Sequence, residues 1–343
     1  MQESESGRRV TLADVAELSG VHTATVSRAL NPAARLKVAA ETVRRVEAAA
    51  HALGYVPNVV ARGLRKRASM TVGVVIPDLT NPFFPPVVRG IEDYLQVHGY
   101  TALLANTDED DDAEEALVTS LLERRVDGLI MATGRHGDRP VLRRLQASGV
   151  RTVMVNRDAS PLPFPLVTGD DALGIAAAVA HLHDLGHRDI VHIAGPLDLS
   201  TSLVRADAFT AAVRARRGIR GRVIEASALS VMAGSEIAPF LLADSPPTAV
   251  VASNDLLAIG VLRALKAQGR SCPEDLAIVG FNDMPFAEDL QPPLTTVHVP
   301  GQAMGTAAAR LLLDALAGDA PGAGAVVLPT SLIVRGSTGP VRR

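Results

Sequence analysis

From residue 71 onward, short apolar runs alternate with stretches of helical periodicity, and this alternation constrains the fold more than any other feature of the chain. The runs VGVVIP, TALLAN, GLIMA and RTVMVN are predicted strands, with helices between them near residues 83–97, 113–125 and 140–148. Strands that alternate with helices form parallel sheets with right-handed crossovers. This stretch therefore predicts one α/β lobe.

The same arrangement repeats after about residue 166. The runs DIVHIAG, GRVIEA, TAVVAS and LAIVGF predict strands, with helices near residues 171–185, 203–216, 232–242 and 254–268. Two such halves imply two α/β lobes. Because ligands bind outside the carboxyl ends of the strands in open parallel sheets, two facing lobes predict one ligand-binding cleft between them.

The charge of the chain is divided unevenly along its length. The whole chain has a formal net charge of −3, but residues 1–67 hold 11 basic and 6 acidic side chains. Residues 68–343 hold 23 basic and 31 acidic side chains. A basic block ahead of an acidic body indicates a nucleic-acid-binding head, because phosphate binding needs clustered positive charge.

The basic block also has an apolar periodicity that a solvated basic tail would lack. Apolar residues recur at helical spacing over residues 12–18 and again over 21–30, with Gly20 between them. A third helical pattern, ETVRRVEAAAHALG, ends at Gly54. Three small helices with surplus basic charge predict a helix-turn-helix head, whose second helix enters the major groove.

Several blocks of the chain resemble one known family. VTLADVAELSGVHTATVSRALN, LGYVPNVVARGLR and MTVGVVIPDLTNPFF resemble the N-terminal signature of the lactose-repressor (LacI) family of bacterial transcription regulators. The similarity continues through HLHDLGHRDIVHIAGP, PPTAVVASNDLLAIGVLRAL, PEDLAIVGFNDMPF and PPLTTVHVP, so it spans nearly the whole chain. It implies an all-α helix-turn-helix head (residues 1–56), a hinge helix and linker (57–70), and a two-lobed, periplasmic-binding-protein-like body of parallel sheets for effector binding and dimerisation (71–343).

The resemblance assigns DNA contacts to the head and the hinge. Arg28 is expected to carry most of the base readout, because a guanidinium can donate two hydrogen bonds to guanine. His22 stands where the family usually has serine, a better helix cap, and this departure weakens the expectation of a phosphate contact there. Leu64 is the expected wedge at a central base step, although a basic linker with a buried leucine is the alternative interpretation. The implied DNA-binding residues are Thr11, Leu12, Thr23, Ala24, Thr25, Ser27, Arg28, Asn31, Tyr55, Asn58, Ala61, Arg62 and Leu64.

Polar residues follow the predicted strands of both lobes and suit a hydroxyl-rich or anionic small molecule. Their positions after strands select Asp78, Arg157 and Asp283 as expected effector-binding residues. The resemblance to the LacI family implies effector contacts at Asn156, Arg205, Asn254 and Asn282, with Phe83 and Phe84 as an apolar wall. A sugar or sugar derivative is the leading effector class, and a purine or another metabolite is the alternative. Several sugar-responsive relatives carry a carboxylate at the Asn282 position, a role that Asp283 could take. For each polar residue, local capping of a turn or helix is the alternative.

Patterns that suggest catalysis or metal binding are weak. The chain has no nucleophile elbow, P-loop, HExxH motif or glycine fingerprint, so we expect no enzyme activity, catalytic residue, cofactor or metal site. His183 and His187 lie one helical turn apart, but Gly186 predicts that His187 lies beyond the helix end. The acidic run from Asp108 to Glu115 lacks the glycine of a calcium loop and is expected to lead into a helix.

The remaining features predict where the protein works and what it binds. One cysteine and an N-terminus without an apolar stretch favour the cytoplasm, and no run is long enough to span a membrane. The resemblance to the LacI family, together with the basic head, implies a homodimeric transcription regulator, a repressor, which binds a pseudo-palindromic operator in double-stranded DNA under effector control. No apolar heptads follow the last strand, so no tetramerising coiled coil is predicted. A soluble sugar-binding protein would share the body but would need an export signal and would lack the basic head.

Overall fold

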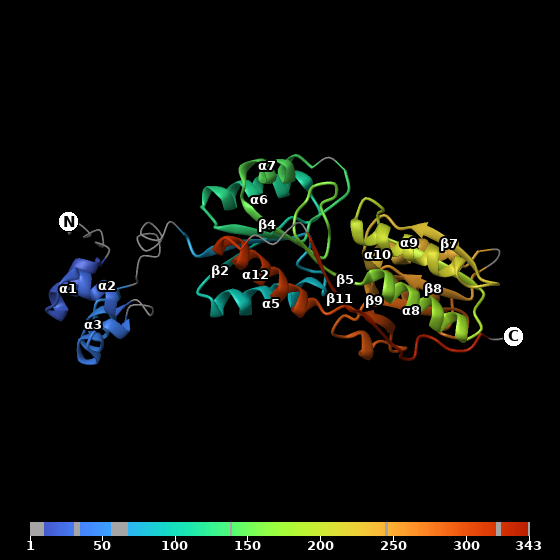
Figure 1. Ribbon diagram of the computed structural model, residues 1–343. Helices are drawn as coiled ribbons and strands as arrows, with labels where there is room; N and C mark the ends of the chain where they lie inside the picture. The colour runs from blue at the N-terminus through green and yellow to red at the C-terminus, as the bar shows by residue number, and fades with distance from the viewer. Residues whose placement is uncertain are drawn as a thin grey trace, which may run out of the picture. The chain divides into compact units, whose positions relative to one another are not determined.

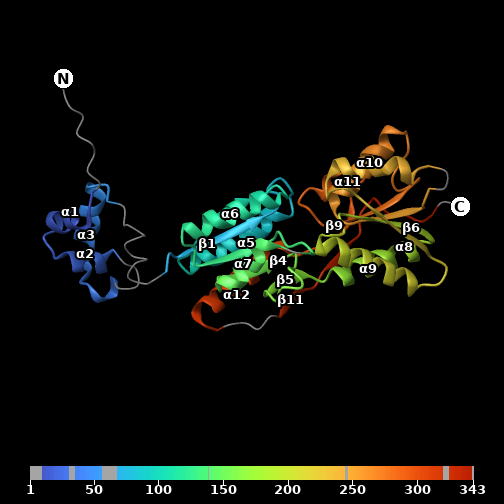
Figure 2. The same cartoon turned by 90° about the horizontal axis from the view of Figure 1, so that it is seen from above.

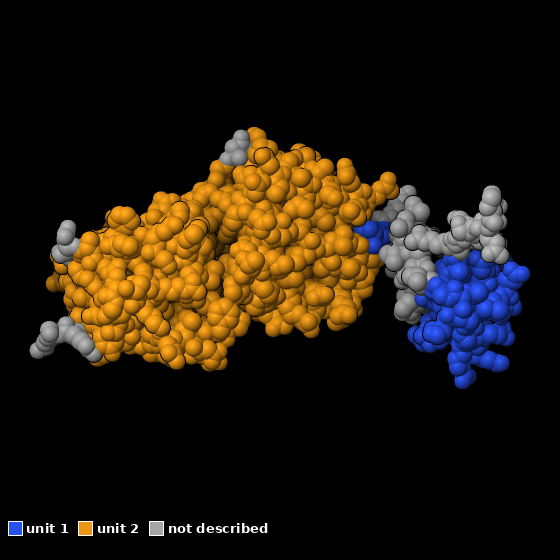
Figure 3. All heavy atoms as spheres, turned by 180° about the vertical axis from the view of Figure 1, so that it is seen from behind, with its two compact units in different colours: residues 1–69 blue, residues 70–343 orange. Residues whose placement is uncertain are grey.

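A computed structural model describes residues 10–30, 35–55, 68–137, 139–243, 246–319 and 324–341. The chain divides into two compact units, Met1–Ser69 and Met70–Arg343, which we call the head and the body (Figure 3). None of the helices in the described ranges is long and apolar enough to cross a membrane.

In the described part of the head, three α-helices surround a core of their own. They are α1 (Leu12–Ser19), α2 (Thr23–Ala29) and α3 (Ala40–Ala52), with a short 3₁₀ helix, η1 (Arg35–Lys37), before α3. Val15, Val26 and Val46 are completely buried among them. Gly20 ends α1 at φ +65°, a left-handed conformation that glycine adopts without steric cost, and so allows the tight turn into α2.

The body has two lobes, each built on a six-stranded sheet. Lobe 1 has the strand order β11-β5-β4-β3-β1-β2, and all its strand pairs are parallel. Its strands are β1 (Thr71–Ile76), β2 (Thr101–Asn106), β3 (Gly128–Met131), β4 (Arg151–Val155), β5 (Leu166–Gly169) and β11 (Ala325–Leu328). Its helices are α5 (Phe84–Val97), α6 (Asp111–Glu123), α7 (Pro140–Ser148) and α12 (Gly301–Ala317), with α5 and α12 against one face of the sheet (Figure 1).

Lobe 2 has the strand order β12-β10-β9-β8-β6-β7, and only β12 runs antiparallel to its neighbour. Its strands are β6 (Asp189–Ala194), β7 (Arg220–Glu225), β8 (Ala249–Ala252), β9 (Ala277–Asn282), β10 (Thr295–His298) and β12 (Ser331–Ile333). Its helices are α8 (Asp171–Asp184), α9 (Ser200–Arg214), α10 (Val231–Leu241), α11 (Asp255–Ala267) and the 3₁₀ helix η2 (Ala287–Asp289). In the view from above, α8 and α9 cover one face of this sheet and α10 and α11 the other (Figure 2). The central strands are apolar and buried, as expected for a parallel sheet covered on both faces.

The chain crosses between the lobes three times, which the sequence repeat did not predict. The crossings lie between β5 and α8, between β10 and α12, and between β11 and β12. A Cβ atom at Gly169 would lie 3.2 Å from side-chain carbons of both Thr330 and Val299, so the three crossing segments pack side by side. The C-terminal helix α12 therefore returns to lobe 1, where Met304, Ala308 and Leu312 are completely buried.

Two glycines allow α12 to contact α5 closely. A Cβ atom at Gly90 would lie 2.0 Å from the carbonyl oxygen of Gln302, and one at Gly305 would lie 2.0 Å from that of Val87. The backbones of the two helices thus touch where any side chain would separate them. This contact joins an early and a late segment of the chain within lobe 1.

Candidate DNA-binding head and ligand-binding body

The second helix of the head presents most of its predicted DNA-contacting side chains to solvent. Thr23, Ala24 and Arg28 on α2 are exposed, whereas Val26 and Ala29 face the core of the head. Thr25 and Ser27 are half-buried. The register of α2 therefore leaves the Arg28 guanidinium available to a base edge.

Thr11 and His22 each cap the start of a helix in the head. Thr11 forms a capping box with Asp14: its hydroxyl accepts from the Asp14 N–H at 3.4 Å, and the Asp14 carboxylate accepts from the Thr11 N–H at 2.7 Å. His22 caps α2, because its Nδ1 accepts from the Ala24 N–H at 3.2 Å. The imidazole thus caps the helix where the family usually has serine.

The other predicted DNA-binding residues fall into two groups. Leu12 and Tyr55 are half-buried and pack against the core of the head. The remaining ones, Asn31, Asn58, Ala61, Arg62 and Leu64, lie outside the described residues, as does most of the predicted hinge.

In lobe 1, the predicted effector residue Arg157 forms an ion pair with a residue that the sequence analysis missed. Arg157 follows β4 and is only 2% exposed. Its Nη1 and Nη2 donate to Oε2 and Oε1 of Glu109 at 3.0 and 2.8 Å. Glu109 follows the edge strand β2, so its side chain reaches past the ends of β1 and β3. Partial burial raises the pKa of Glu109, but hydrogen bonds and positive charge from Arg157 and Arg135 outweigh this effect and lower it below its ordinary value.

The other polar residues predicted at strand ends of lobe 1 are Asp78 and Asn156. Asp78 follows β1 and accepts from the Thr80 N–H at 2.8 Å, so it closes a turn. Asn156 lies in the left-handed region at φ +67°, and its backbone N–H donates to Val167. The alternative of local capping therefore describes the observed contact of Asp78.

The two predicted wall residues, Phe83 and Phe84, are buried in lobe 1. They are 7% and 2% exposed, and their rings meet edge to face with centroids 5.3 Å apart. Both belong to the core of lobe 1, because α5 begins here and packs its apolar face on the sheet. Their role as an apolar wall toward an effector stays a prediction.

In lobe 2, Arg205 is held on three sides. Its Nε and Nη2 donate to the two carboxylate oxygens of Asp171, both at 3.1 Å, and its Nη1 donates to the Ser253 carbonyl at 2.6 Å. The guanidinium also lies over the ring of Phe281, 3.9 Å from its centroid. Asp171 begins α8 and is 6% exposed, so both charges of this pair are buried.

Two other predicted residues of lobe 2 have internal partners. Asn254 caps α11: its Oδ1 accepts from the Leu257 N–H at 2.8 Å, and its Nδ2 donates to the Leu229 carbonyl at 3.1 Å. Asp283 pairs with His298 at 3.0 Å and with Arg335 at 2.8 Å. The α11 cap and the hydrogen bond to Leu229 thus occupy both polar atoms of Asn254, and His298 and Arg335 each contact one oxygen of Asp283.

Asn282 and Ser202 differ from these residues, because each has a buried oxygen without a hydrogen-bond partner among the described atoms. The atoms are Asn282 Oδ1 and Ser202 Oγ. Asn282 ends β9 at φ +108°, a strained conformation for a residue other than glycine. A buried, unsatisfied oxygen costs free energy unless a ligand or water binds it. These two oxygens are therefore the strongest ligand-binding candidates in lobe 2.

The strand ends of the two lobes face each other. The Asp158 N–H, after β4 of lobe 1, donates to Ser200 Oγ of lobe 2 at 3.0 Å. Arg135, after β3, pairs with Asp198, after β6, at 2.7 Å. The loops that carry the predicted effector residues therefore meet at one junction, where a parallel sheet binds its ligands.

Comparison with known proteins identifies the family. Residues 11–58 match the lacI family of bacterial regulatory proteins, and residues 179–338 match a periplasmic binding protein-like domain. Over 95% of its length the chain is 37% identical to the HTH-type transcriptional regulator MalR of Streptomyces coelicolor, covering 96% of that protein. The chain belongs to the lacI family of bacterial transcriptional regulators.

Solved structures of lacI-family regulators share its fold. The lac repressor dimer bound to operator and the anti-inducer ONPF superposes with a TM-score of 0.85 at 29% identity, over 97% of this chain and all of that one. A complex of the transcriptional regulator CelR with cellobiose gives a TM-score of 0.73 at 32% identity, over 96% of this chain and all of that one. These findings confirm the predicted family, the helix-turn-helix head with a two-lobed body, and a regulator rather than an enzyme.

Three residues of this lacI-family regulator that matter at the junction were missed by sequence reasoning: Glu109, Asp171 and Ser202. Glu109 lies in the acidic run that was correctly predicted to precede a helix, and α6 begins at Asp111 with Asp110 as its cap. Asp171 also begins a helix, so both carboxylates resembled ordinary helix-start residues. Only the long-range pairing with Arg157 and Arg205 reveals their second role.

The histidine pair is positioned as the sequence predicted. His183 lies in α8, which ends at Asp184, and His187 follows the turn at Gly186. Nε2 of His187 lies 3.0 Å from the carbonyl oxygen of Gly339. Its nearest polar contact is thus the C-terminal segment of the chain.

Proposed function

We propose that this regulator is a cytoplasmic, homodimeric repressor, which binds a pseudo-palindromic operator in double-stranded DNA and is controlled by a small-molecule effector between its lobes. Residues 1–56 act as the DNA-binding head, 57–70 as hinge helix and linker, and 71–343 as the effector-binding and dimerisation body. One head per subunit matches two half-sites related by a two-fold axis. The observation that carries the proposal is that Arg28 on α2 is exposed to solvent, while α1, α2 and α3 share a buried core.

Exposed apolar side chains on lobe 2 support dimerisation. On α10, Met232 and Phe240 are 72% and 80% exposed, and Phe286, before η2, is 44% exposed. Large apolar side chains in water favour burial against a partner. A second subunit on this lobe would cover them.

The effector that the junction fits best is an uncharged, hydroxyl-rich molecule such as a sugar. Arg157 and Arg205 are each held in a bidentate pair by an internal carboxylate, so neither has an unbalanced charge for an anion. Asn282 Oδ1 and Ser202 Oγ can accept hydrogen bonds from hydroxyl groups. A purine would need an open aromatic face, and the face of Phe281 is already covered by Arg205.

The DNA-binding part is tested by gel shift on the DNA that flanks the gene, with random DNA as competitor. Arg28→Ala should relax base preference and cost about 1–3 kcal/mol on the specific site, because it removes a bidentate contact to a base. Arg45→Ala, at an exposed position on α3, is the matched control and should leave base preference intact. An unchanged preference profile in Arg28→Ala would reject this assignment.

The proposed hinge needs a separate variant. Leu64→Ala should weaken binding to the palindromic site far more than binding to random DNA, because a wedge acts only in the specific, bent complex. Equal losses on the two DNAs would favour the basic-linker interpretation.

The effector class is tested by calorimetry with neutral sugars, sugar phosphates and purines. A neutral sugar should bind, and Asn282→Ala should weaken that binding about tenfold or more, since one buried hydrogen bond is lost. Asn106→Ala is the control: Asn106 ends β2, and the substitution removes its hydrogen bonds with the Leu79 N–H after β1 and with Asp108. Binding of sugar phosphates or purines alone would reject the neutral class and leave the DNA-binding proposal untouched.

A further inference from the structure

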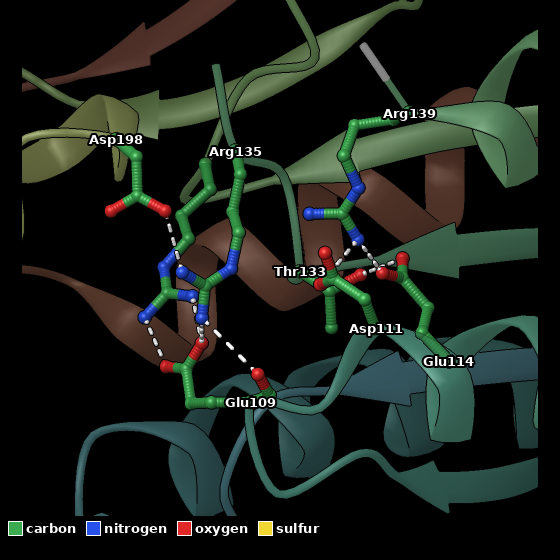
Figure 4. Close-up of polar contacts among 8 residues, drawn as sticks. Glu109, Asp111, Glu114, Thr133, Arg135, Arg139 and Asp198 are labelled. Carbon is green, nitrogen blue, oxygen red and sulfur yellow. Dashed lines mark hydrogen bonds and ion pairs between the residues drawn. The ribbon is translucent and has the colours of Figure 1, made fainter. Parts of the chain in front are cut away.

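Arg135 joins the two lobes by ion pairs to a carboxylate of each. It follows β3 in lobe 1, and its side chain is 20% exposed. Its Nη2 lies 2.6 Å from Oε2 of Glu109 in lobe 1, and its Nη1 lies 2.7 Å from Oδ2 of Asp198 in lobe 2 (Figure 4). One guanidinium thus uses both of its ends to bridge the junction.

Backbone contacts fix the position of this bridge. The His136 N–H, next to Arg135, donates to the Asp198 carbonyl at 2.7 Å. The loop that carries Asp198 is itself held, because the Leu197 N–H donates to Glu225 at 3.0 Å. Both ends of the bridge therefore lie on positioned segments, which lowers the entropic cost of forming the ion pair.

The bridge is connected to the predicted effector site through Glu109. The same carboxylate that contacts Arg135 forms the bidentate pair with buried Arg157. A neighbouring ion pair, Arg139 with Glu114 and Asp111, lies wholly within lobe 1 and makes no such link (Figure 4). Glu109 cannot change its contact with Arg157 without changing the charge that faces Arg135.

We propose that Arg135 is an ionic latch that holds the lobes in contact, and that Glu109 couples this latch to Arg157. The three crossing segments connect the lobes covalently, and Arg135 pairs with Asp198 across the junction, so an opening of the lobes on this side of the junction would separate the pair. The bridge favours arginine over lysine. The two ends of a guanidinium can each donate to a different carboxylate, whereas lysine has a single ammonium group. Arg135 is thus a positioning residue, and its coupling to the effector rests on the proposed function.

The latch can be tested without any effector. Pulsed electron–electron double resonance on the full chain measures the distance between one spin label in each lobe. In a Cys272→Ser background, spin labels are placed by Glu123→Cys on α6 and Asp207→Cys on α9, which are exposed positions in lobes 1 and 2. Labelled subunits are diluted with unlabelled chain so that distances within one subunit dominate. Circular dichroism checks that each variant is folded.

Arg135→Ala should broaden the interlobe distance distribution and add a population at longer distances. Arg135→Lys should fall between Ala and the parent, and 1 M KCl should shift the parent toward Arg135→Ala, because salt screens partly exposed ion pairs. Arg144→Ala is the matched control, since the pair of Arg144 with Glu115 lies within lobe 1. A distribution in Arg135→Ala equal to that of the parent would overturn the latch.

Glu109→Gln separates the two parts of the proposal. An intermediate shift of the distance distribution supports the coupling, because Arg135 then keeps the negative charge of Asp198 but loses that of Glu109. A parental distribution in Glu109→Gln, with a shift in Arg135→Ala, would reject the coupling and retain the latch. Because these distances need neither operator nor effector, failure of the proposed function would appear separately, in the gel shift and in calorimetry.

Discussion

Arg157 of lobe 1 and Arg205 of lobe 2 both make bidentate ion pairs near strand ends, yet their partners differ. Asp171 is 6% exposed and serves Arg205 alone among the ion pairs described, whereas the Glu109 side chain is 35% exposed and is shared between Arg157 and Arg135. Glu109 also lies on a turn at φ +60°. The carboxylate of lobe 2 is therefore buried and fixed to one arginine, a fixed platform, whereas the carboxylate of lobe 1 is partly open to water and contacts two arginines, between which its hydrogen bonds can be redistributed.

The largest effect is expected when the buried pair of lobe 2 is broken. Asp171→Asn should lower the free energy of unfolding of the body by about 3–5 kcal/mol, because it leaves the buried Arg205 guanidinium without its counter-charge. Urea denaturation followed by circular dichroism measures this loss. Asp189→Asn is the control: its partner Arg220 has a side chain that is 84% exposed, so about 1 kcal/mol or less is expected. Equal losses in the two variants would refute the idea of a fixed platform.

A second buried carboxyl of lobe 2, Asp255, should make the free energy of unfolding depend on pH. This carboxyl, at the start of α11, is 1% exposed and accepts hydrogen bonds from Thr296 and Met284, and burial raises its pKa to about 7. The unfolded chain loses this proton near pH 4. Between these two pH values the folded state holds more protons than the unfolded state. This group therefore stabilises the folded state at low pH. That stabilisation is lost as the pH rises toward 7, by up to about 1.4 kcal/mol per pH unit.

Asp255→Asn should remove this dependence. From about pH 5 to about pH 7, the free energy of unfolding of the parent relative to Asp255→Asn should fall by roughly 2–3 kcal/mol. Urea denaturation at the two pH values measures the change. A constant difference between parent and variant would show that this carboxyl does not titrate in the window.

The smallest effect is expected at the shared carboxylate of lobe 1. Glu109→Gln should lower the free energy of unfolding by about 1–2 kcal/mol, less than Asp171→Asn, because its site is partly open to water and the amide still accepts one hydrogen bond. The same urea denaturation compares the two variants directly. A loss at Glu109 as large as that at Asp171 would erase the difference between the lobes.

Local patterns predicted most elements of the fold but not how distant segments combine. The strands β1–β4 and β6–β9 and the helices from α5 to α11 follow from local patterns, because each forms its own apolar run or apolar face. The return of α12 to lobe 1 depends on contacts such as Gly90 with Gln302, more than 200 residues apart. No window of the sequence contains both partners of such a contact.

The candidate site was predicted in the same uneven way. The resemblance selected Arg157, Arg205 and Asn282, but it could not separate Asn254, whose amide caps α11, from Asn282, whose oxygen is unsatisfied. Both are asparagines at strand ends, and only the surrounding donors distinguish them. The partners Glu109 and Asp171 were missed because an acidic residue at a helix start already has a sufficient local explanation.

The position of α12 has a consequence for synthesis on the ribosome. The head completes its core within the first 55 residues, so it can fold while the rest of the chain is still being made. Lobe 1 begins at residue 71 but cannot cover the face of α5 that contacts Gly305 until α12 has emerged, some 230 residues later. A nascent chain therefore carries a complete DNA-binding head ahead of an incomplete body, and a chain that ends before residue 301 would lack the helix that covers α5 in lobe 1.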